Sequence, residues 1–160
     1  MTTLEFINSK IFSFSEIENL ISLWKSEKQK VVFTNGCFDV LHYGHACYLS
    51  KSKDLGDKLI VGLNSDESVK RLKGPTRPIN GQNERAKLLA SLLFVDAVVI
   101  FEEDTPEKLI TKVHPDVLVK GGDYTYETIV GAPFVSSYGG TVITIPLVEN
   151  FSSTNIINRL

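Results

Sequence analysis

The chain has 160 residues, of which 42% are hydrophobic and 22% are charged, and its formal net charge is −2. These values are typical of one globular domain with an adequate core, and they argue against nucleic acid or an anionic membrane as a partner. The N-terminal residues lack the features of a signal peptide, and no apolar run approaches the ~20 residues that span a bilayer. We therefore expect a cytoplasmic protein. Its two cysteines, Cys37 and Cys47, are expected to be buried or half-buried thiols, although the sequence does not fix their redox state.

Residues 1–29 are predicted to form a helical extension that precedes the main domain, residues 30–160. Ser13 and Glu16 match a capping box, and they introduce an amphipathic helix over Phe14–Glu27. The pattern does not indicate whether this helix packs on the main domain or on a partner.

Apolar runs alternate with helical patterns from residue 30 onward. Strands are predicted at Lys30–Thr34, Lys58–Asn64, Val95–Phe101, Asp116–Lys120 and Thr141–Ile145. Helices are predicted at Gly44–Leu55, Ser65–Leu72, Gln82–Phe94, Pro106–Val113, Tyr126–Ser137 and Thr154–Arg159, and a loop at Lys73–Asn80. Because the strands are almost wholly apolar, they indicate a parallel sheet covered on both faces. The expected fold is therefore a Rossmann-like, doubly wound α/β domain with five strands, although no GxGxxG motif for a dinucleotide follows the first strand.

The segment VVFTNGCFDVLHYGH, residues 31–45, is the most informative part of the chain. It joins a strand to a helix, and in parallel α/β sheets this junction binds ligands. Backbone N–H groups and the helix dipole favour a phosphate there, and two imidazoles add donors and, when protonated, positive charge. The alternatives are a structural histidine pair or, for histidines at i, i+3 spacing, a metal site, but no Cys/His cluster elsewhere completes a zinc site. The residues of interest in this segment are Gly36, Phe38, Asp39, His42, Gly44 and His45.

The motif in this segment, GCFD followed by HYGH, resembles the signature of the HxGH nucleotidyltransferase superfamily, in its cytidylyltransferase-like branch. Members of that superfamily transfer a nucleotidyl group from an NTP to a phosphorylated acceptor and release pyrophosphate. The resemblance extends over residues 30–160. Within the family, the segments RLKGPTRPIN, FEEDTPEKLI, PDVLVKGGDY and STNII are most similar to the D-glycero-β-D-manno-heptose 1-phosphate adenylyltransferases.

The resemblance implies that both histidines of the motif contact the triphosphate and stabilise the transition state. Residues 70–78 concentrate basic side chains in an otherwise slightly acidic chain. A mobile basic loop there would close over a triphosphate and neutralise its charge, with a solvated surface loop as the alternative. The predicted catalytic residues are His42, His45, Lys73 and Arg77.

The other predicted site residues follow strand ends or precede helices. Asp39 is expected to order the loop or fix a histidine, with a simple turn residue as the alternative. Asp66 is expected to face the acceptor, with a helix cap as the alternative. From position and resemblance together, the nucleotide is expected to be bound by Thr34, Asn35, Gly36, Phe38, Asp39, Gly44, Arg85, Gly121, Asp123, Ser152, Ser153 and Thr154. The acceptor is expected to be bound by Asp66, Lys120, Gly122 and Tyr124.

These expectations describe a nucleotidyltransferase that joins NMP from an NTP, with ATP as the expected donor, to heptose 1-phosphate. The NDP-heptose would feed the synthesis of lipopolysaccharide or another surface glycan. Mg²⁺ is expected on the NTP phosphates, because the sequence shows no carboxylate cage for it. The chain has no room for the kinase to which such domains are fused in many bacteria, so a separate heptose kinase is expected. The family also implies a homodimer.

Two other functions stay open at this point. A CTP-dependent transferase acting on glycerol 3-phosphate, or on another polyol or sugar phosphate, would share every phosphate-binding residue. A nucleotide-binding sensor without catalysis is the second alternative, and the intact His42 and His45 argue against it. The sequence does not fix the nucleobase, the sugar phosphate or its anomer, because bases are read mainly by backbone groups.

Overall fold

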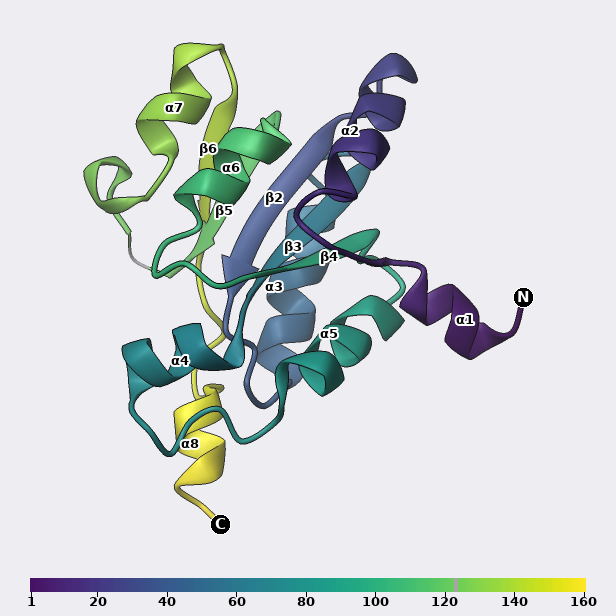
Figure 1. The fold of residues 1–160 in the computed structure, drawn as a ribbon. Coiled ribbons are helices and arrows are strands. Elements are labelled where there is room, and N and C mark those ends of the chain that lie inside the picture. Colours follow the sequence, from purple (N-terminus) through teal and green to yellow (C-terminus); the bar gives the residue numbers. More distant parts are fainter. Residues whose placement is uncertain (123) are drawn as a thin grey trace.

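A computed structural model of the chain describes residues 1–122 and 124–160, so Asp123, a predicted nucleotide-binding residue, lies outside the described residues. The structure is a parallel sheet with helices on both faces (Figure 1). The strands are β1 (Ile11–Phe12), β2 (Val31–Gly36), β3 (Lys58–Asn64), β4 (Ala97–Phe101), β5 (Val117–Gly121) and β6 (Thr141–Ile145). The helices are α1 (Thr3–Asn8), α2 (Ile17–Ser26), α3 (Tyr43–Lys53), α4 (Asp66–Lys73), α5 (Gln82–Ser91), α6 (Glu107–Val113), the short 3-10 helix η1 (Tyr126–Thr128), α7 (Ala132–Ser137) and α8 (Ser153–Ile157).

The sheet has the strand order β1-β4-β3-β2-β5-β6, and every pair of neighbours is parallel. The predicted Rossmann-like, doubly wound class is confirmed, but the predicted number of five strands is wrong by one. The additional strand is β1, which pairs Ile11 with Val98 and Phe12 with Val99 at the edge of β4. A strand of two residues shows no alternation of apolar and polar positions, so the sequence pattern does not reveal it.

The N-terminal residues pack against this sheet. Helix α2 buries Trp24 in the apolar cluster beneath it. The predicted capping pair is present just before α2, since the backbone N–H of Glu16 donates to Ser13 Oγ and that of Ser13 donates to the Glu16 carboxylate. The sequence did not predict α1, which begins with a capping box of Thr2 and Glu5.

Two apolar clusters cover the two faces of the sheet. Val32 and Val117 belong to the cluster beneath α3 and α5, whereas Phe33 and Leu118 belong to the cluster beneath α2, α6 and α7. This division follows from the alternation of side chains along a strand. Counting along a strand from one of these four residues therefore gives the face of the sheet on which any other residue of that strand lies.

The carboxyl ends of the strands lie at one edge of the sheet, together with α4 and α8 (Figure 1). The predicted bounds of β3 and β6 are confirmed. The helix predicted over Tyr126–Ser137 is divided into η1 and α7, because Gly131 between them adopts a left-handed conformation with φ 83°. In the part of the chain that the structure describes, none of the helices has the length and apolar character needed to cross a membrane.

Candidate active site

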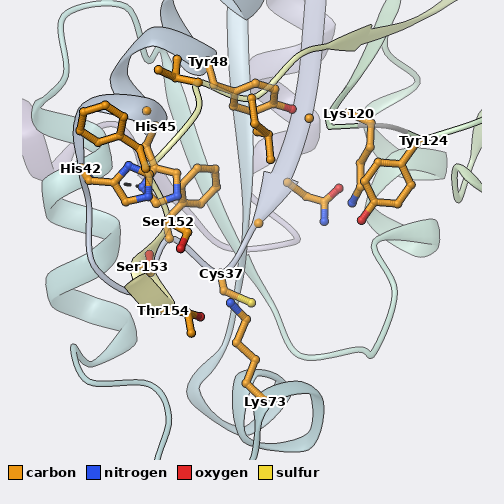
Figure 2. Close-up of a pocket in the computed structure, with 18 residues that line it drawn as sticks. Cys37, His42, His45, Tyr48, Lys73, Lys120, Tyr124, Ser152, Ser153 and Thr154 are labelled. Atoms are coloured by element: carbon orange, nitrogen blue, oxygen red, sulfur yellow. Dashed lines mark hydrogen bonds between the residues drawn. The ribbon is translucent and has the colours of Figure 1, made fainter. Parts of the chain in front are cut away.

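The candidate site lies where the strand order reverses, because β2 has β3 on one side and β5 on the other. The carboxyl ends of parallel strands diverge at such a point and leave a crevice for ligands. A cavity of ≈ 350 Å³ occupies this position (Figure 2). It is lined by Asn35, Gly36, Cys37, Phe38, His42, Gly44, His45, Tyr48, Lys73, Lys120, Gly121, Tyr124, Leu147, Val148, Phe151, Ser152, Ser153 and Thr154.

Most of the predicted site residues are brought together in this lining, including both histidines. The predicted site residues of the described chain that do not line the cavity are Thr34, Asp39, Asp66, Arg77, Arg85 and Gly122. The roles predicted for these residues stay predictions. Gly122 follows β5 in a left-handed conformation with φ 96°, and its N–H donates to the carbonyl of Ile145 at 3.0 Å. The positions of the other five are described below.

The two histidines form a stacked pair at the start of α3. His42 is the N-cap residue of that helix, and its ring lies 3.7 Å from the ring of His45, centroid to centroid, with an interplanar angle of 21°. The backbone N–H of His42 donates to His45 Nδ1 at 3.4 Å. His42 Nδ1 is buried and has no hydrogen-bond partner within the described residues. This nitrogen is directed at the first turn of α3, since a Cβ atom on Gly44 would lie 3.0 Å from it.

Both histidines are neutral in this environment. Burial lowers the pKa of His42 below its ordinary value of 6.5. Burial, the neighbouring His42 and the ammonium of Lys73 together lower the pKa of His45 to about 4. An anion placed between these groups would have the opposite effect, since a nearby negative charge favours the protonated ring. The free site is therefore prepared to gain positive charge when a phosphate binds.

Gly44 allows the first histidine to lie against the helix N-terminus. A Cβ atom at this position would lie 2.9 Å from the Cβ of Phe151 and 3.0 Å from the ring of His42. The space that a side chain would fill is thus taken by the histidine ring and by the segment preceding α8. The glycine of the motif is required for the packing of the site, in addition to leaving room for phosphates.

Two lysines enter the cavity from different elements. Lys73 ends α4 and lies beside Cys37, whereas Lys120 precedes the last residue of β5 and lies beside Tyr124 (Figure 2). Neither ammonium has a hydrogen bond or ion pair with a described residue. Burial lowers the pKa of Lys120, whose Nζ lies 5.2 Å from the centroid of the Tyr124 ring. Burial also raises the pKa of the Cys37 thiol, although Lys73 opposes that effect.

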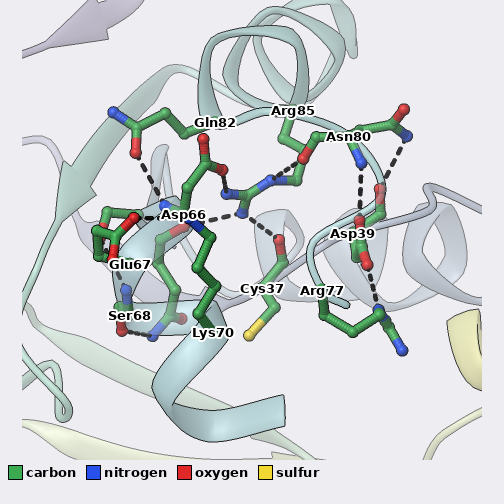
Figure 3. A network of polar contacts seen from close by, with 12 residues as sticks. Cys37, Asp39, Asp66, Glu67, Ser68, Lys70, Arg77, Asn80, Gln82 and Arg85 are labelled. Carbon is green, nitrogen blue, oxygen red and sulfur yellow. Dashed lines mark hydrogen bonds and ion pairs between the residues drawn. The ribbon is translucent and has the colours of Figure 1, made fainter. Parts of the chain in front are cut away.

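Arg77 lies outside the cavity lining and is paired with Asp39 (Figure 3). Its Nε donates to the Asp39 carboxylate at 2.5 Å, and that carboxylate also accepts the backbone N–H groups of Ile79 and Asn80. Burial alone would raise the pKa of Asp39, but these hydrogen bonds outweigh it and hold the pKa below its ordinary value. The pair therefore attaches the loop after α4 to the loop that carries His42. Arg77 Nη2 is buried without a partner in the described part of the chain.

Arg85 is fully buried and also lies outside the cavity lining (Figure 3). Its guanidinium donates to the backbone carbonyls of Asn80, Cys37 and Asn64 and to the carboxylate of Asp66 at 2.7 Å. These acceptors belong to the ends of β2 and β3 and to the loop before α5. One planar group thus holds together three segments that surround the cavity.

Three hydroxyl residues of the predicted site have hydrogen-bond partners within the protein. Thr34 is buried beneath the cavity, where its Oγ1 lies 2.5 Å from the hydroxyl of Tyr48. Ser153 donates to the backbone carbonyl of Val40 at 3.0 Å, which fixes α8 to the loop before the histidines. Ser152 caps α8 by accepting the N–H of Asn155.

The sequence analysis did not assign five of the lining residues to the site. Tyr48 follows His45 by one turn of α3, so helical spacing alone was sufficient to find it. Burial raises the pKa of Tyr48 to about 12, and the phenol therefore stays protonated. Cys37 lies within the recognised motif and is a free, half-buried thiol like Cys47. The others, Leu147, Val148 and Phe151, reach the cavity only in the folded chain, where the Phe151 ring stacks against that of His42.

The chain belongs to the cytidylyltransferase-like family, whose sequence pattern matches residues 33–159. Among named relatives, it is 53% identical over 153 residues to the bifunctional protein HldE of Syntrophotalea carbinolica and 56% identical over 151 residues to that of Campylobacter concisus. These matches cover 96% and 94% of this chain but 31% of each relative. The chain thus spans about a third of the length of the curated relatives it matches.

Two solved structures are similar in fold. A lipopolysaccharide core biosynthesis protein from Thermoplasma volcanium has a TM-score of 0.61 and 32% identity, covering 77% of this chain and 99% of that protein. A pantoate-beta-alanine ligase from Francisella tularensis has a TM-score of 0.58 over 94% of this chain and 78% of the ligase. Its identity of 17% makes it evidence for the shared fold alone.

Proposed function

We propose that the chain transfers AMP from ATP to heptose 1-phosphate, giving ADP-heptose and pyrophosphate. The observation that carries this proposal is the stacked pair of His42 and His45 at the cavity where the strand order reverses. Membership of the cytidylyltransferase-like family supports nucleotidyl transfer as the reaction.

In the proposed reaction, an oxygen of the acceptor phosphate forms a bond to the α-phosphorus of the NTP. The bond from that phosphorus to the bridging oxygen breaks, and its electron pair leaves with pyrophosphate. The barrier consists mainly of charge crowding and alignment, so positioned donors and cations supply most of the catalysis. The cavity offers two imidazoles, the ammonium of Lys73 and the N–H groups in the first turn of α3.

The histidines are proposed to hold the triphosphate. Its charge would raise the pKa of both rings and make them donors at neutral pH. Both rings line the cavity and are therefore within reach of a triphosphate bound there. Arg77 and Arg85 are proposed to position this site through the backbone.

Mg²⁺ is proposed to enter as part of the NTP substrate. Within residues 1–122 and 124–160, no three His, Cys, Asp or Glu side chains are arranged to hold a metal ion. The described lining of the cavity is likewise composed of neutral and basic residues. A hard cation that prefers oxygen ligands would therefore be carried on the phosphates.

Heptose 1-phosphate is proposed as the acceptor because of the sequence segments that resemble heptose 1-phosphate adenylyltransferases. Similarity to bifunctional HldE proteins and to a lipopolysaccharide core biosynthesis protein supports the same assignment. A separate kinase would supply the acceptor, and the enzyme would act in the cytoplasm as a homodimer.

The test is a steady-state measurement of pyrophosphate release with ATP, GTP or CTP against heptose 1-phosphate and glycerol 3-phosphate. We expect the highest kcat/KM for ATP with heptose 1-phosphate. A higher kcat/KM for CTP with glycerol 3-phosphate would contradict the proposal. Binding of ATP without pyrophosphate release with any acceptor would identify a nucleotide sensor instead.

A further inference from the structure

Tyr48 occupies the point where β2 and β5 separate. The paired register of the two strands ends at Phe33 and Leu118. Thr34 and Val119 are the next residues, and the hydroxyl of Tyr48 reaches both of them from α3. It lies 2.5 Å from Thr34 Oγ1 and 3.3 Å from the carbonyl oxygen of Val119. The phenol thus bridges the two strands where their own pairing stops.

The hydrogen bonds of this phenol have a fixed direction. A carbonyl oxygen can only accept, so the single O–H of Tyr48 donates to Val119. The fully buried Thr34 hydroxyl must then donate to the oxygen of Tyr48. Because burial raises the pKa of Tyr48 to about 12, the phenol keeps the proton on which this arrangement depends.

The ring of Tyr48 forms part of the cavity wall. A Cβ atom on Gly121, the last residue of β5, would lie 3.1 Å from this ring, so the strand and the ring are in close contact. His45 lies one turn earlier on α3 and also lines the cavity. In the view of Figure 2, Tyr48 lies between His45 and Lys120. The phenol therefore connects the helix that carries the histidines to the strand on the other side of the cavity.

Nucleotidyl transfer is sensitive to such a connection. The reacting atoms must lie about 3–3.5 Å apart and in line, and a displacement of about 1 Å can lower the rate by about 100-fold. The place of His45 in the cavity depends on how its turn of α3 sits on the sheet. The two hydrogen bonds of Tyr48 fix the following turn of that helix to β2 and β5.

On the basis of the proposed function, we propose that Tyr48 is a positioning residue. Its hydroxyl holds the first turns of α3, and thereby His45, against the separated ends of β2 and β5. Thr34 supports Tyr48 by donating to its oxygen, whereas the sequence analysis expected Thr34 to bind the nucleotide. Without the phenolic hydroxyl the nucleotide still binds, but the histidine is misplaced in the transition state, so the loss falls on kcat.

The test compares Tyr48→Phe with the matched control Tyr138→Phe. Tyr138 also donates to a backbone carbonyl, that of Pro115 at 2.7 Å, but it is not among the described residues that line the cavity. Both variants keep an aromatic ring and lose a hydrogen bond of the same kind. In steady-state pyrophosphate release with ATP and heptose 1-phosphate, we expect Tyr48→Phe to lower kcat by about tenfold. Tyr138→Phe should keep kcat within about twofold of the wild type.

Calorimetry separates positioning from binding. It measures the Kd of α,β-methylene-ATP, a non-transferable analogue of ATP, for each protein. We expect this Kd to stay within about twofold of the wild type in Tyr48→Phe, because the phenol acts on the nucleotide only through His45.

A second pair of variants removes the partner of the tyrosine. Thr34→Val should also lower kcat, and Thr34→Ser, which keeps a hydroxyl, should recover most of that loss. The double variant of Thr34→Val and Tyr48→Phe should lose no more kcat than Tyr48→Phe alone, because both changes break one shared hydrogen bond. The two Thr34 variants decide the question even if Tyr48→Phe fails to fold.

NMR spectra of the histidine side chains give a readout that does not depend on turnover. Tyr48→Phe should shift the imidazole signals of His45 and leave those of His114 in place. Tyr138→Phe should do the reverse, because the Tyr138 ring stacks on that of His114 with 3.6 Å between centroids.

Each outcome decides a separate point. Equal kcat values for Tyr48→Phe and Tyr138→Phe would overturn the inference. A weaker Kd of the analogue at unchanged kcat would also overturn it, since the hydroxyl would then serve binding. A wild-type protein that releases no pyrophosphate would contradict the proposed function itself. In that case the NMR spectra decide, and unchanged His45 signals in Tyr48→Phe would show that the phenol does not position the histidine.

Discussion

The basic residues around the cavity form two groups with different surroundings. Arg85 is buried and donates to a carboxylate and to three backbone carbonyls, whereas Arg77 is half-buried, donates to the Asp39 carboxylate and keeps an Nη2 without a described partner. Lys73 and Lys120 face the cavity and have no hydrogen-bond or ion-pair partner in the described residues. A guanidinium whose donors are engaged holds the backbone in place, whereas a free ammonium is available to a phosphate. The comparison leads us to propose that hydrogen-bond partners separate positioning residues from substrate-binding residues within one basic cluster.

The largest expected effect tests the positioning group. Arg85→Ala should reduce the free energy of unfolding by about 3–5 kcal/mol, because Asp66 and three backbone carbonyls lose their donor. Urea denaturation measures this change. The control is Arg71→Ala, which removes an exposed ion pair with Asp104 and should change the free energy of unfolding much less than Arg85→Ala, because exposed ion pairs contribute little. If both variants lose the same free energy of unfolding, Arg85 does not hold its neighbouring segments in place more than an exposed arginine does.

The next effect tests the histidines that face the cavity. His45→Ala should lower kcat by about 100-fold or more, the effect of removing one preorganised donor from a transition state, while the unfolding transition stays cooperative. Steady-state pyrophosphate release and circular dichroism check both parts. His114→Ala, an exposed histidine at the end of α6, is the matched control and should keep full kcat. Near-normal turnover in His45→Ala would remove this residue from the mechanism.

A smaller effect separates two lysines on the same helix. Lys73→Ala should raise the Kd of α,β-methylene-ATP by about tenfold, because a cavity-facing ammonium is lost. Lys70→Ala removes an exposed lysine paired with Glu67 and should leave that Kd unchanged. If both variants bind the analogue like the wild type, residues 70–78 are a solvated surface loop.

The smallest expected effect concerns pH. The pKa of His45 is about 4 in the folded protein and near its ordinary value of 6.5 in the unfolded chain, so the unfolded state binds more protons between these values. The stability of the free protein should therefore decrease as pH falls from 6.5 to 4, by about 1 kcal/mol for this partly exposed ring. Urea denaturation at several pH values should show that the free energy of unfolding decreases less steeply for His45→Asn than for the wild type. If the free energy of unfolding falls equally steeply with pH in the wild type and in His45→Asn, His45 is not held neutral in the folded protein.

Local sequence signals were sufficient for much of the fold and for the centre of the site. The strand bounds of β3 and β6 were predictable because turn residues flank apolar runs at both ends. The histidine pair was predictable because both rings belong to one continuous motif. The contribution of Leu147, Val148 and Phe151 to the cavity was not predictable, because it depends on where the chain runs after β6 in the folded protein.

The contacts of the two arginines were beyond the reach of sequence reasoning. A basic residue next to a phosphate-binding motif has the same pattern whether it faces the ligand or a carbonyl. Only the folded chain shows that Arg85 contacts the carbonyl of Cys37, far away in sequence.

The two-residue strand β1 has a practical consequence for anyone who trims this protein. The family match starts at residue 33, so a fragment cut to that match would lack the segment that pairs with Val98 and Val99. Its β4 edge would then expose unpaired backbone groups, which recruit strands from other molecules and lead to aggregation. The same cut would remove α2, whose Trp24 is buried in the core, and the first two residues of β2. Insolubility of such a fragment would therefore report on the missing N-terminal elements, and it would carry no information about catalysis.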